Sequence, residues 1–136
     1  MLQFVPITLW EEFTLPGEAN IPLQVTPFPV SHGVPTCGYC INDGSKQVAI
    51  CGDTGLSEST ITALNRLGPL NRLAIECAYS NHFDALAKIS NHLTPHRLAK
   101  LLDALDTLPE ELWITHLKPK QRERIASELC QQLPLT

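Results

Sequence analysis

The chain has 136 residues, 43% of them hydrophobic and 18% charged, and this length fits a single domain of residues 1–136. It contains no apolar run approaching the ~18–20 residues of a membrane-spanning helix, and its first residues lack the pattern of a signal peptide, so we expect neither a membrane protein nor a secreted one. The net charge of −4 argues against a protein that holds long nucleic acid on its own basic surface.

The first half of the chain predicts short strands and one helix. Proline residues punctuate the first thirty positions, which allows short extended pieces but no helix interior. Residues 23–30 form an apolar extended run, and residues 36–41 and 46–51 flank Asn42-Asp-Gly-Ser45, a strong hairpin turn signal. Residues 57–67 have helical spacing, with Ser57 or Ser59 as the cap.

The second half repeats a rhythm of strand followed by helix. Residues 73–77 and 112–115 are short apolar strands, and residues 84–89 have helical spacing. Thr94 and Pro95 predict the cap and first position of a helix with an apolar leucine face, and Pro119 opens a last helix. The alternation predicts an α/β fold.

The five cysteines are odd in number and lack framework spacing, so we expect reduced and mostly buried thiols. Cys37 and Cys40 have Cys-x-x-Cys spacing, but no second pair completes a zinc ribbon. On a strand, an offset of three also sends the two sulfurs to opposite faces. A hairpin turn follows where a thioredoxin-type motif needs a helix.

Three polar residues, His32, Asp53 and His116, each stand directly after an apolar run that predicts a strand. The chain that emerges from a buried strand is a rigid platform for ligands and catalytic groups. Two imidazoles and one carboxylate form a set that zinc or manganese accepts. For each residue alone, the alternative is a hydrogen-bonded turn residue. The glycines that flank Asp53-Thr54 indicate a close backbone approach around that carboxylate.

Glu76 lies within an apolar strand, so it must be paired, metal-bound or at a strand edge. His92 and His96 have the spacing of a metalloprotease helix, but a leucine stands where the catalytic glutamate is needed and a proline opens the helix. His92 is a candidate general acid, and its alternative role is to cap the helix. His82 and His96 are expected to be surface or packing residues.

Six segments in order resemble the C-terminal half of class II cyclic nucleotide phosphodiesterases, which belong to the metallo-β-lactamase superfamily. They are Phe28-Pro-Val-Ser-His-Gly33, Cys37-Gly-Tyr39, Gly52-Asp-Thr-Gly55, Ile75-Glu-Cys77, Asn91-His-Leu-Thr-Pro95 and Trp113-Ile-Thr-His-Leu-Lys-Pro119. The resemblance covers nearly the whole chain. It implies the C-terminal half of an αββα sandwich, in which each half contributes roughly one sheet.

The resemblance also implies roles for individual residues. His32 and His116 match metal-ligand histidines, and Asp53 matches the carboxylate that bridges two divalent ions, which are zinc with manganese as the alternative. His92 and Asp53 are the expected catalytic residues, with His92 near the scissile phosphate, and Glu76 matches a carboxylate beneath the site. The implied reaction is hydrolysis of a 3′,5′-cyclic nucleotide such as cyclic AMP to the 5′-nucleotide.

The family's His-x-His-x-Asp-His signature, which supplies four further metal ligands, is absent, because no His-x-His occurs in the chain and the earliest histidine is His32. Two protein ligands per ion predict weak metal binding and an incomplete stand-alone enzyme. A lone half also exposes the inner face of its sheet, which would pair with a second copy or a complementing N-terminal half. The alternatives are a non-catalytic remnant that binds a partner through this face, and another superfamily phosphoesterase such as a tRNA 3′-end processing endonuclease. We expect a cytoplasmic location.

Overall fold

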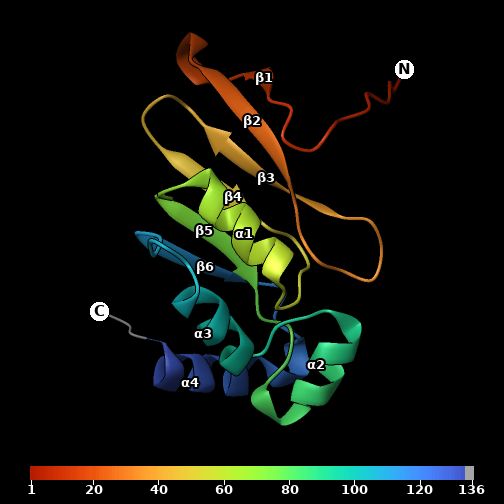
Figure 1. The fold of residues 1–136 in the computed structure, drawn as a ribbon, viewed down its shortest axis with the longest axis vertical. Coiled ribbons are helices and arrows are strands. Elements are labelled where there is room, and N and C mark those ends of the chain that lie inside the picture. The colour runs from red at the N-terminus through yellow and green to blue at the C-terminus, as the bar shows by residue number, and fades with distance from the viewer. Residues whose placement is uncertain (134–136) are drawn as a thin grey trace.

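A computed structural model describes residues 1–133, in which six strands form one sheet (Figure 1). The strands and α-helices alternate in the second half of the chain, as predicted, so the α/β class is confirmed. Their bounds in chain order are β1 Phe13–Pro16, β2 Pro22–Pro29, β3 Cys37–Asn42, β4 Gln47–Ile50, α1 Glu58–Leu67, β5 Arg72–Glu76, α2 Asp84–Ser90, α3 Pro95–Asp103, β6 Glu111–Thr115 and α4 Arg122–Gln132.

The predicted turn and cap residues form the hydrogen bonds expected of them. Asp43 accepts hydrogen bonds from the backbone N–H groups of Ser45 and Lys46 and closes the hairpin between β3 and β4. Ser57 caps α1 by accepting from the Thr60 N–H, and Thr94 caps α3 in the same way from Arg97.

Two details differ from the expectations. The proline-rich start contains a three-residue 3₁₀ turn, Glu18–Asn20, between β1 and β2. The last helix is also preceded by a 3₁₀ turn, so Pro119 opens that turn and α4 begins only at Arg122. Both turns are short enough to sit beside prolines, because proline is tolerated at the first position of a helical turn.

The direction of the strands places four strand ends at one edge of the sheet. Neighbours from β1 to β4 are antiparallel, whereas β4, β5 and β6 are parallel. Two antiparallel steps make β2 run in the same direction as β4. The carboxyl ends of β2, β4, β5 and β6 therefore lie at the same edge, which is where His32, Asp53 and His116 follow their strands.

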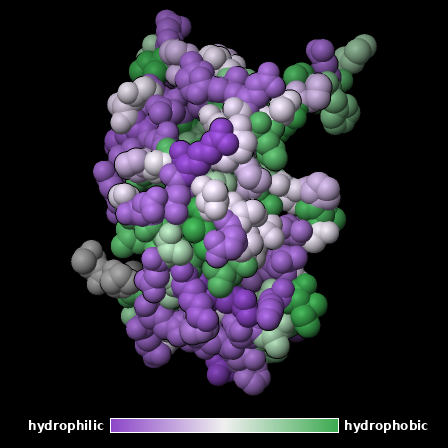
Figure 2. Space-filling view, viewed as in Figure 1, coloured by the Kyte–Doolittle hydropathy of each residue, from purple (hydrophilic) through white to green (hydrophobic). Residues whose placement is uncertain are grey.

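One apolar core fills the space between the sheet and the helices α1, α3 and α4. In Figure 1, α1 crosses in front of the strands and α3 packs beside α4. The outer surface over α3 and α4 is largely hydrophilic (Figure 2), as amphipathic helices require. In residues 1–133, no helix has the length and apolarity that a membrane crossing demands. The largest fully buried side chains of this core include Phe28, Leu73, Ile75, Leu93, Leu98, Leu101 and Ile125.

The opposite face of the sheet carries an apolar row that no described helix covers. Tyr39 pairs with Ile50, Ile50 with Ala74, and Ala74 with Trp113 along the register of four neighbouring strands. Tyr39, Ile50 and Trp113 are 37%, 44% and 49% exposed. Successive side chains of a strand point to opposite faces of the sheet, so this row lies on the face opposite the one that forms the core. The expected bare apolar face is therefore present.

Candidate metal centre

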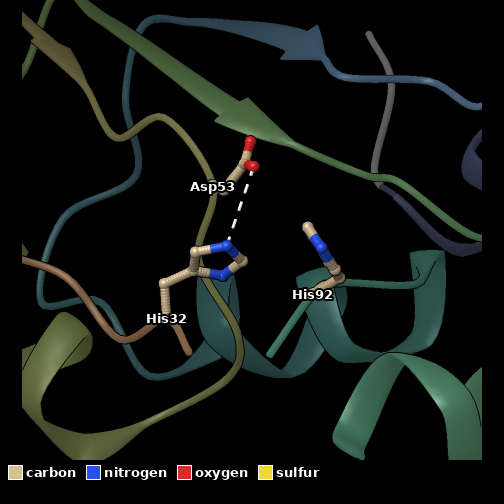
Figure 3. Close-up of side chains that lie close together, drawn as sticks. All are labelled: His32, Asp53 and His92. Carbon is tan, nitrogen blue, oxygen red and sulfur yellow. Dashed lines mark ion pairs between the residues drawn. The ribbon is translucent and has the colours of Figure 1, made fainter. Parts of the chain in front are cut away.

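Asp53 is the central group of a cluster at the edge of the sheet. Its Oδ2 lies 3.9 Å from His32 Nε2, and its Oδ1 lies 3.5 Å from His116 Nδ1. The ring of His92 is centred 5.0 Å from that of His32 and stacks on His116 at 5.4 Å. Potential ligand atoms of His32, Asp53 and His92 all lie within 4.8 Å of one another (Figure 3). The structure therefore brings together the three strand-end residues and His92.

The orientation of His32 is fixed from behind by the chain that leads into α3. Its Nδ1 lies 3.2 Å from the carbonyl oxygen of Asn91, and a carbonyl can only accept, so Nδ1 carries the proton. Nε2 is then the free nitrogen that faces Asp53. Gly55 allows the Asn91 backbone to pack closely against it, since a Cβ at position 55 would lie 3.0 Å from the Asn91 Cα. No sequence pattern indicates the role of the Asn91 carbonyl, because that role depends on a tertiary contact.

Glu76 is fully buried beneath the cluster and accepts four hydrogen bonds. Its Oε1 accepts from the Thr54 N–H at 2.9 Å and from His92 Nδ1 at 2.6 Å. Its Oε2 accepts from the N–H groups of Ala78 at 3.2 Å and Leu93 at 3.0 Å. The sequence left three alternatives for this carboxylate: paired, metal-bound or at a strand edge. The structure shows that it is paired with hydrogen-bond donors.

His92 is consequently held with its Nε2 toward the cluster. Its side chain is only 11% exposed, and the Glu76 carboxylate occupies its Nδ1. A carboxylate that accepts from one imidazole nitrogen fixes the tautomer and ring orientation of the other. This arrangement serves either a metal-ligating histidine or a proton donor, and it excludes the alternative in which His92 only caps a helix, since Thr94 caps α3.

The segment that carries His92 is anchored on both sides by an ion pair. Arg97 in α3 donates two hydrogen bonds of 2.9 Å to the Asp84 carboxylate at the start of α2, and Thr94 donates a third. The Arg97 hydrogen bonds, together with that of Thr94, hold the pKa of Asp84 below its usual range, although burial opposes them. The residues between α2 and α3 therefore have little freedom to move.

The backbone around the cluster adopts unusual conformations. Gly52, just before Asp53, has a φ of 66°, which glycine tolerates without cost. His116 has a φ of 60°, a left-handed conformation that a residue with a Cβ adopts only against strain of about 1–3 kcal/mol. Such strain persists where the surrounding structure over-determines the position, which is typical of functional sites.

The donor set fits a first-row divalent ion. Zinc bonds of about 2.0–2.1 Å in a tetrahedral site place neighbouring ligand atoms roughly 3.3–3.4 Å apart. The 3.5 and 3.9 Å separations between Asp53 and its two imidazoles are within a small side-chain adjustment of that value. One oxygen of Asp53 faces each imidazole, so His32 and His116 approach different oxygens of one carboxylate. A metal ion beside either imidazole would find two or three protein ligands, fewer than a closed site provides.

The other sequence candidates lie outside this cluster. Cys40 belongs to the buried core, and Cys37 is not among the described residues that group around Asp53. His82 and His96 are exposed, as expected. Burial raises the pKa of the Cys77 thiol, directly after Glu76, to about 12, and the nearby carboxylates of Glu76 and Glu128 add to the shift. This thiol is therefore a packing group.

Known structures share this fold over most of the chain. The metallo-β-lactamase fold protein YhfI from Bacillus subtilis matches with a TM-score of 0.71 and 18% identity over 96% of this chain and 49% of its own. Igni18, a metallo hydrolase from Ignicoccus hospitalis, matches with a TM-score of 0.62 and 16% identity over 93% and 53%. The short form of human tRNase Z matches with a TM-score of 0.55 and 17% identity over 81% and 40%.

The chain spans about half the length of these solved structures. A comparison with curated proteins finds no match. The family model described as the beta-lactamase superfamily domain matches residues 1–117, which include all four residues of the cluster. The chain belongs to the beta-lactamase superfamily domain family.

Proposed function

We propose that this chain is the metal-binding C-terminal half of a hydrolase that opens 3′,5′-cyclic nucleotides, with cyclic AMP as the substrate to test. The observation that carries the proposal is the position of Asp53 between two imidazoles, beside a histidine that a buried carboxylate orients. His32, Asp53 and His116 would hold two divalent ions, with zinc favoured by the nitrogen donors and manganese as the alternative.

The residues of the cluster have different roles in the proposed reaction. Bound divalent ions supply Lewis-acid polarisation of the phosphate and an activated hydroxide. Asp53 and the two strand-end histidines fix the phosphate at the edge of the sheet by holding those ions. In its doubly protonated form, His92 would donate the Nε2 proton to the 3′ oxygen as the P–O3′ bond breaks and would return to the Nδ1–H form, which the Glu76 carboxylate holds through Nδ1. The product is the 5′-nucleotide.

The exposed apolar face of the sheet, opposite the helices, supports the proposal that a second protein segment completes this domain. Tyr39, Ile50 and Trp113 lie along one row of the register, in which the buried Ala74 separates Ile50 from Trp113, and all three present apolar surface to solvent. Exposed apolar patches of this kind mark interaction surfaces. A complementing N-terminal half or a second copy of the chain would cover it, and the former would add the metal ligands that this chain lacks.

A tRNA 3′-end processing activity is the second candidate, because the short form of human tRNase Z shares the fold over 81% of this chain. The net charge of −4 argues against it, since phosphate contacts dominate the binding of long nucleic acid. A precursor tRNA that is cleaved faster than cyclic AMP under the same conditions would favour this second candidate.

The test is hydrolysis of cyclic AMP by the purified chain with added zinc or manganese, alone and with an N-terminal segment that contains His-x-His-x-Asp-His. We expect metal-dependent formation of 5′-AMP, its loss in Asp53→Asn, and a large decrease in turnover in His92→Ala with metal content nearly unchanged. Loss of metal equal to loss of turnover in His92→Ala would make His92 a ligand instead of the acid. A metal-loaded chain with no hydrolysis in either form would contradict the proposal.

A non-catalytic remnant is separated from this proposal by metal affinity. A remnant that binds a partner through its bare sheet has no need of a metal at His32, Asp53 and His116. Retention of zinc by the wild-type chain, with loss in the Asp53 variant, therefore supports the hydrolase, whereas a chain that binds a partner but no metal supports the remnant.

A further inference from the structure

Lys118 lies beside the cluster in a position that the proposed reaction does not yet use. It follows His116 by two residues, and Leu117 between them packs against the core. Its ammonium lies over the ring of Tyr79, 5.5 Å from the ring centre, within the range of a cation–π contact. The ring of Tyr79 in turn meets the ring of His92 edge to face, with 5.8 Å between the centroids.

Backbone hydrogen bonds between the loops fix this arrangement. The Lys118 N–H donates to the Ala78 carbonyl at 3.3 Å, and the Tyr79 N–H donates to the Leu93 carbonyl at 3.2 Å. The loop after β6 is thereby joined to the loop after β5, which is joined to the segment that carries His92. Tyr79 contacts both His92 and Lys118, so the position of the ammonium is set by the fold and not only by its own flexible stem.

Among the residues that the structure describes, no carboxylate pairs with the ammonium of Lys118. Within residues 1–133, ion pairs of lysine and arginine engage Arg72, Arg97 and Arg124, whereas no carboxylate oxygen lies within 4.0 Å of Lys118 Nζ. The side chain is half-buried. The Tyr79 ring keeps this ammonium in place without neutralising its charge, so the ammonium can bind an anion that enters the site.

We propose that Lys118, positioned by Tyr79, binds a phosphoryl oxygen of the substrate on the side of the site where Tyr79 packs against His92. This inference deepens the proposed function and depends on it for the class of substrate. A lysine is a compact point charge with three donors, which suits a phosphate oxygen that points away from the metal-binding residues. The role requires no chemical step at Lys118.

The test measures binding of inorganic phosphate to the zinc-treated chain by isothermal titration calorimetry, so it does not depend on turnover. Lys118→Gln should weaken phosphate binding about tenfold, since charge-assisted hydrogen bonds are the strong class. Lys118→Arg should restore most of the affinity, and Lys120→Gln, an exposed neighbour, should leave it unchanged. Tyr79→Leu should weaken binding about threefold because the ring that holds the ammonium is lost, whereas Tyr79→Phe should not.

Two further measurements separate this role from others. Zinc affinity should be equal in wild type and Lys118→Gln, because Lys118 is not a ligand, and a parallel loss of zinc would overturn the proposal in favour of a structural role. Acetate in place of phosphate should show little dependence on Lys118, and equal dependence would overturn the phosphoryl assignment. Wild type that binds no phosphate, or binds it as Lys118→Gln does, overturns the proposal whether or not cyclic AMP is hydrolysed.

Discussion

Replacing Glu76 by Gln changes one oxygen into an NH₂ group at the centre of four hydrogen bonds. If the amide oxygen takes the Oε1 position, the NH₂ group faces two backbone N–H donors, those of Ala78 and Leu93. If it takes the Oε2 position, the NH₂ group faces the Thr54 N–H and His92 Nδ1. The second orientation costs less, because the imidazole can move its proton to Nε2 and accept at Nδ1.

The second orientation leaves one buried donor, the Thr54 N–H, without an acceptor. A buried donor in that state costs about 1–3 kcal/mol, so we expect Glu76→Gln to lower the free energy of unfolding by about that amount. We also expect His92 to change from the Nδ1–H to the Nε2–H tautomer, which removes the free nitrogen from the cluster. The two consequences arise from the same four hydrogen bonds.

Urea unfolding followed by circular dichroism measures the first effect, and ¹⁵N chemical shifts of the imidazole in the metal-free chain measure the second. Glu12→Gln is the matched control, because Glu12 is exposed and should change stability by no more than about 0.5 kcal/mol. A Glu76→Gln chain as stable as that control, with the His92 tautomer unchanged, would show that the buried carboxylate neither stabilises the fold nor sets the tautomer of His92.

Three other predictions follow from the structure. The pKa of Asp84 is lower in the folded chain than in the unfolded one, so its ion pair stabilises the fold above the unfolded pKa of about 3.9. This stabilisation is lost as pH falls through the folded pKa. Urea unfolding of Asp84→Asn should therefore show a smaller loss of stability from pH 5 to pH 2 than that of wild type. Alkylation at pH 8 in the native state should modify exposed Cys130 and spare Cys77, whose pKa is about 12, and rapid modification of Cys77 would contradict its burial. The double variant Ile50→Lys, Trp113→Lys should bind less of the apolar dye ANS than wild type, and equal fluorescence would show that the sheet face is already covered.

The local structure and the ends of the strands were predictable because they depend on short-range chemistry. The turn at Asp43, the cap at Ser57 and the Thr94-Pro95 helix start each use residues close in sequence. His32 and Asp53 follow strands that run in the same direction, so their meeting at one edge followed once the strands were recognised.

The contacts that orient the site were not predictable from the same signals. The strand β1 was not distinguished from the other proline-bounded pieces, because its four residues carry little periodicity. The Asn91 carbonyl behind His32 and three of the four donors around Glu76 come from residues 16 to 59 positions apart, and they depend on how helices and strands pack. Lys118 and Tyr79 likewise meet only through the folding of separate loops.

Zinc binding by the purified chain, measured by calorimetry in wild type, Asp53→Asn and Asp103→Asn, shows directly whether Asp53 and its histidines form a metal centre. Asp103 is an exposed aspartate at the end of α3 and provides the matched control. We expect measurable but weak zinc binding by wild type and by Asp103→Asn, and at least tenfold weaker binding by Asp53→Asn. Zinc affinity in Asp53→Asn equal to that of wild type would contradict this expectation.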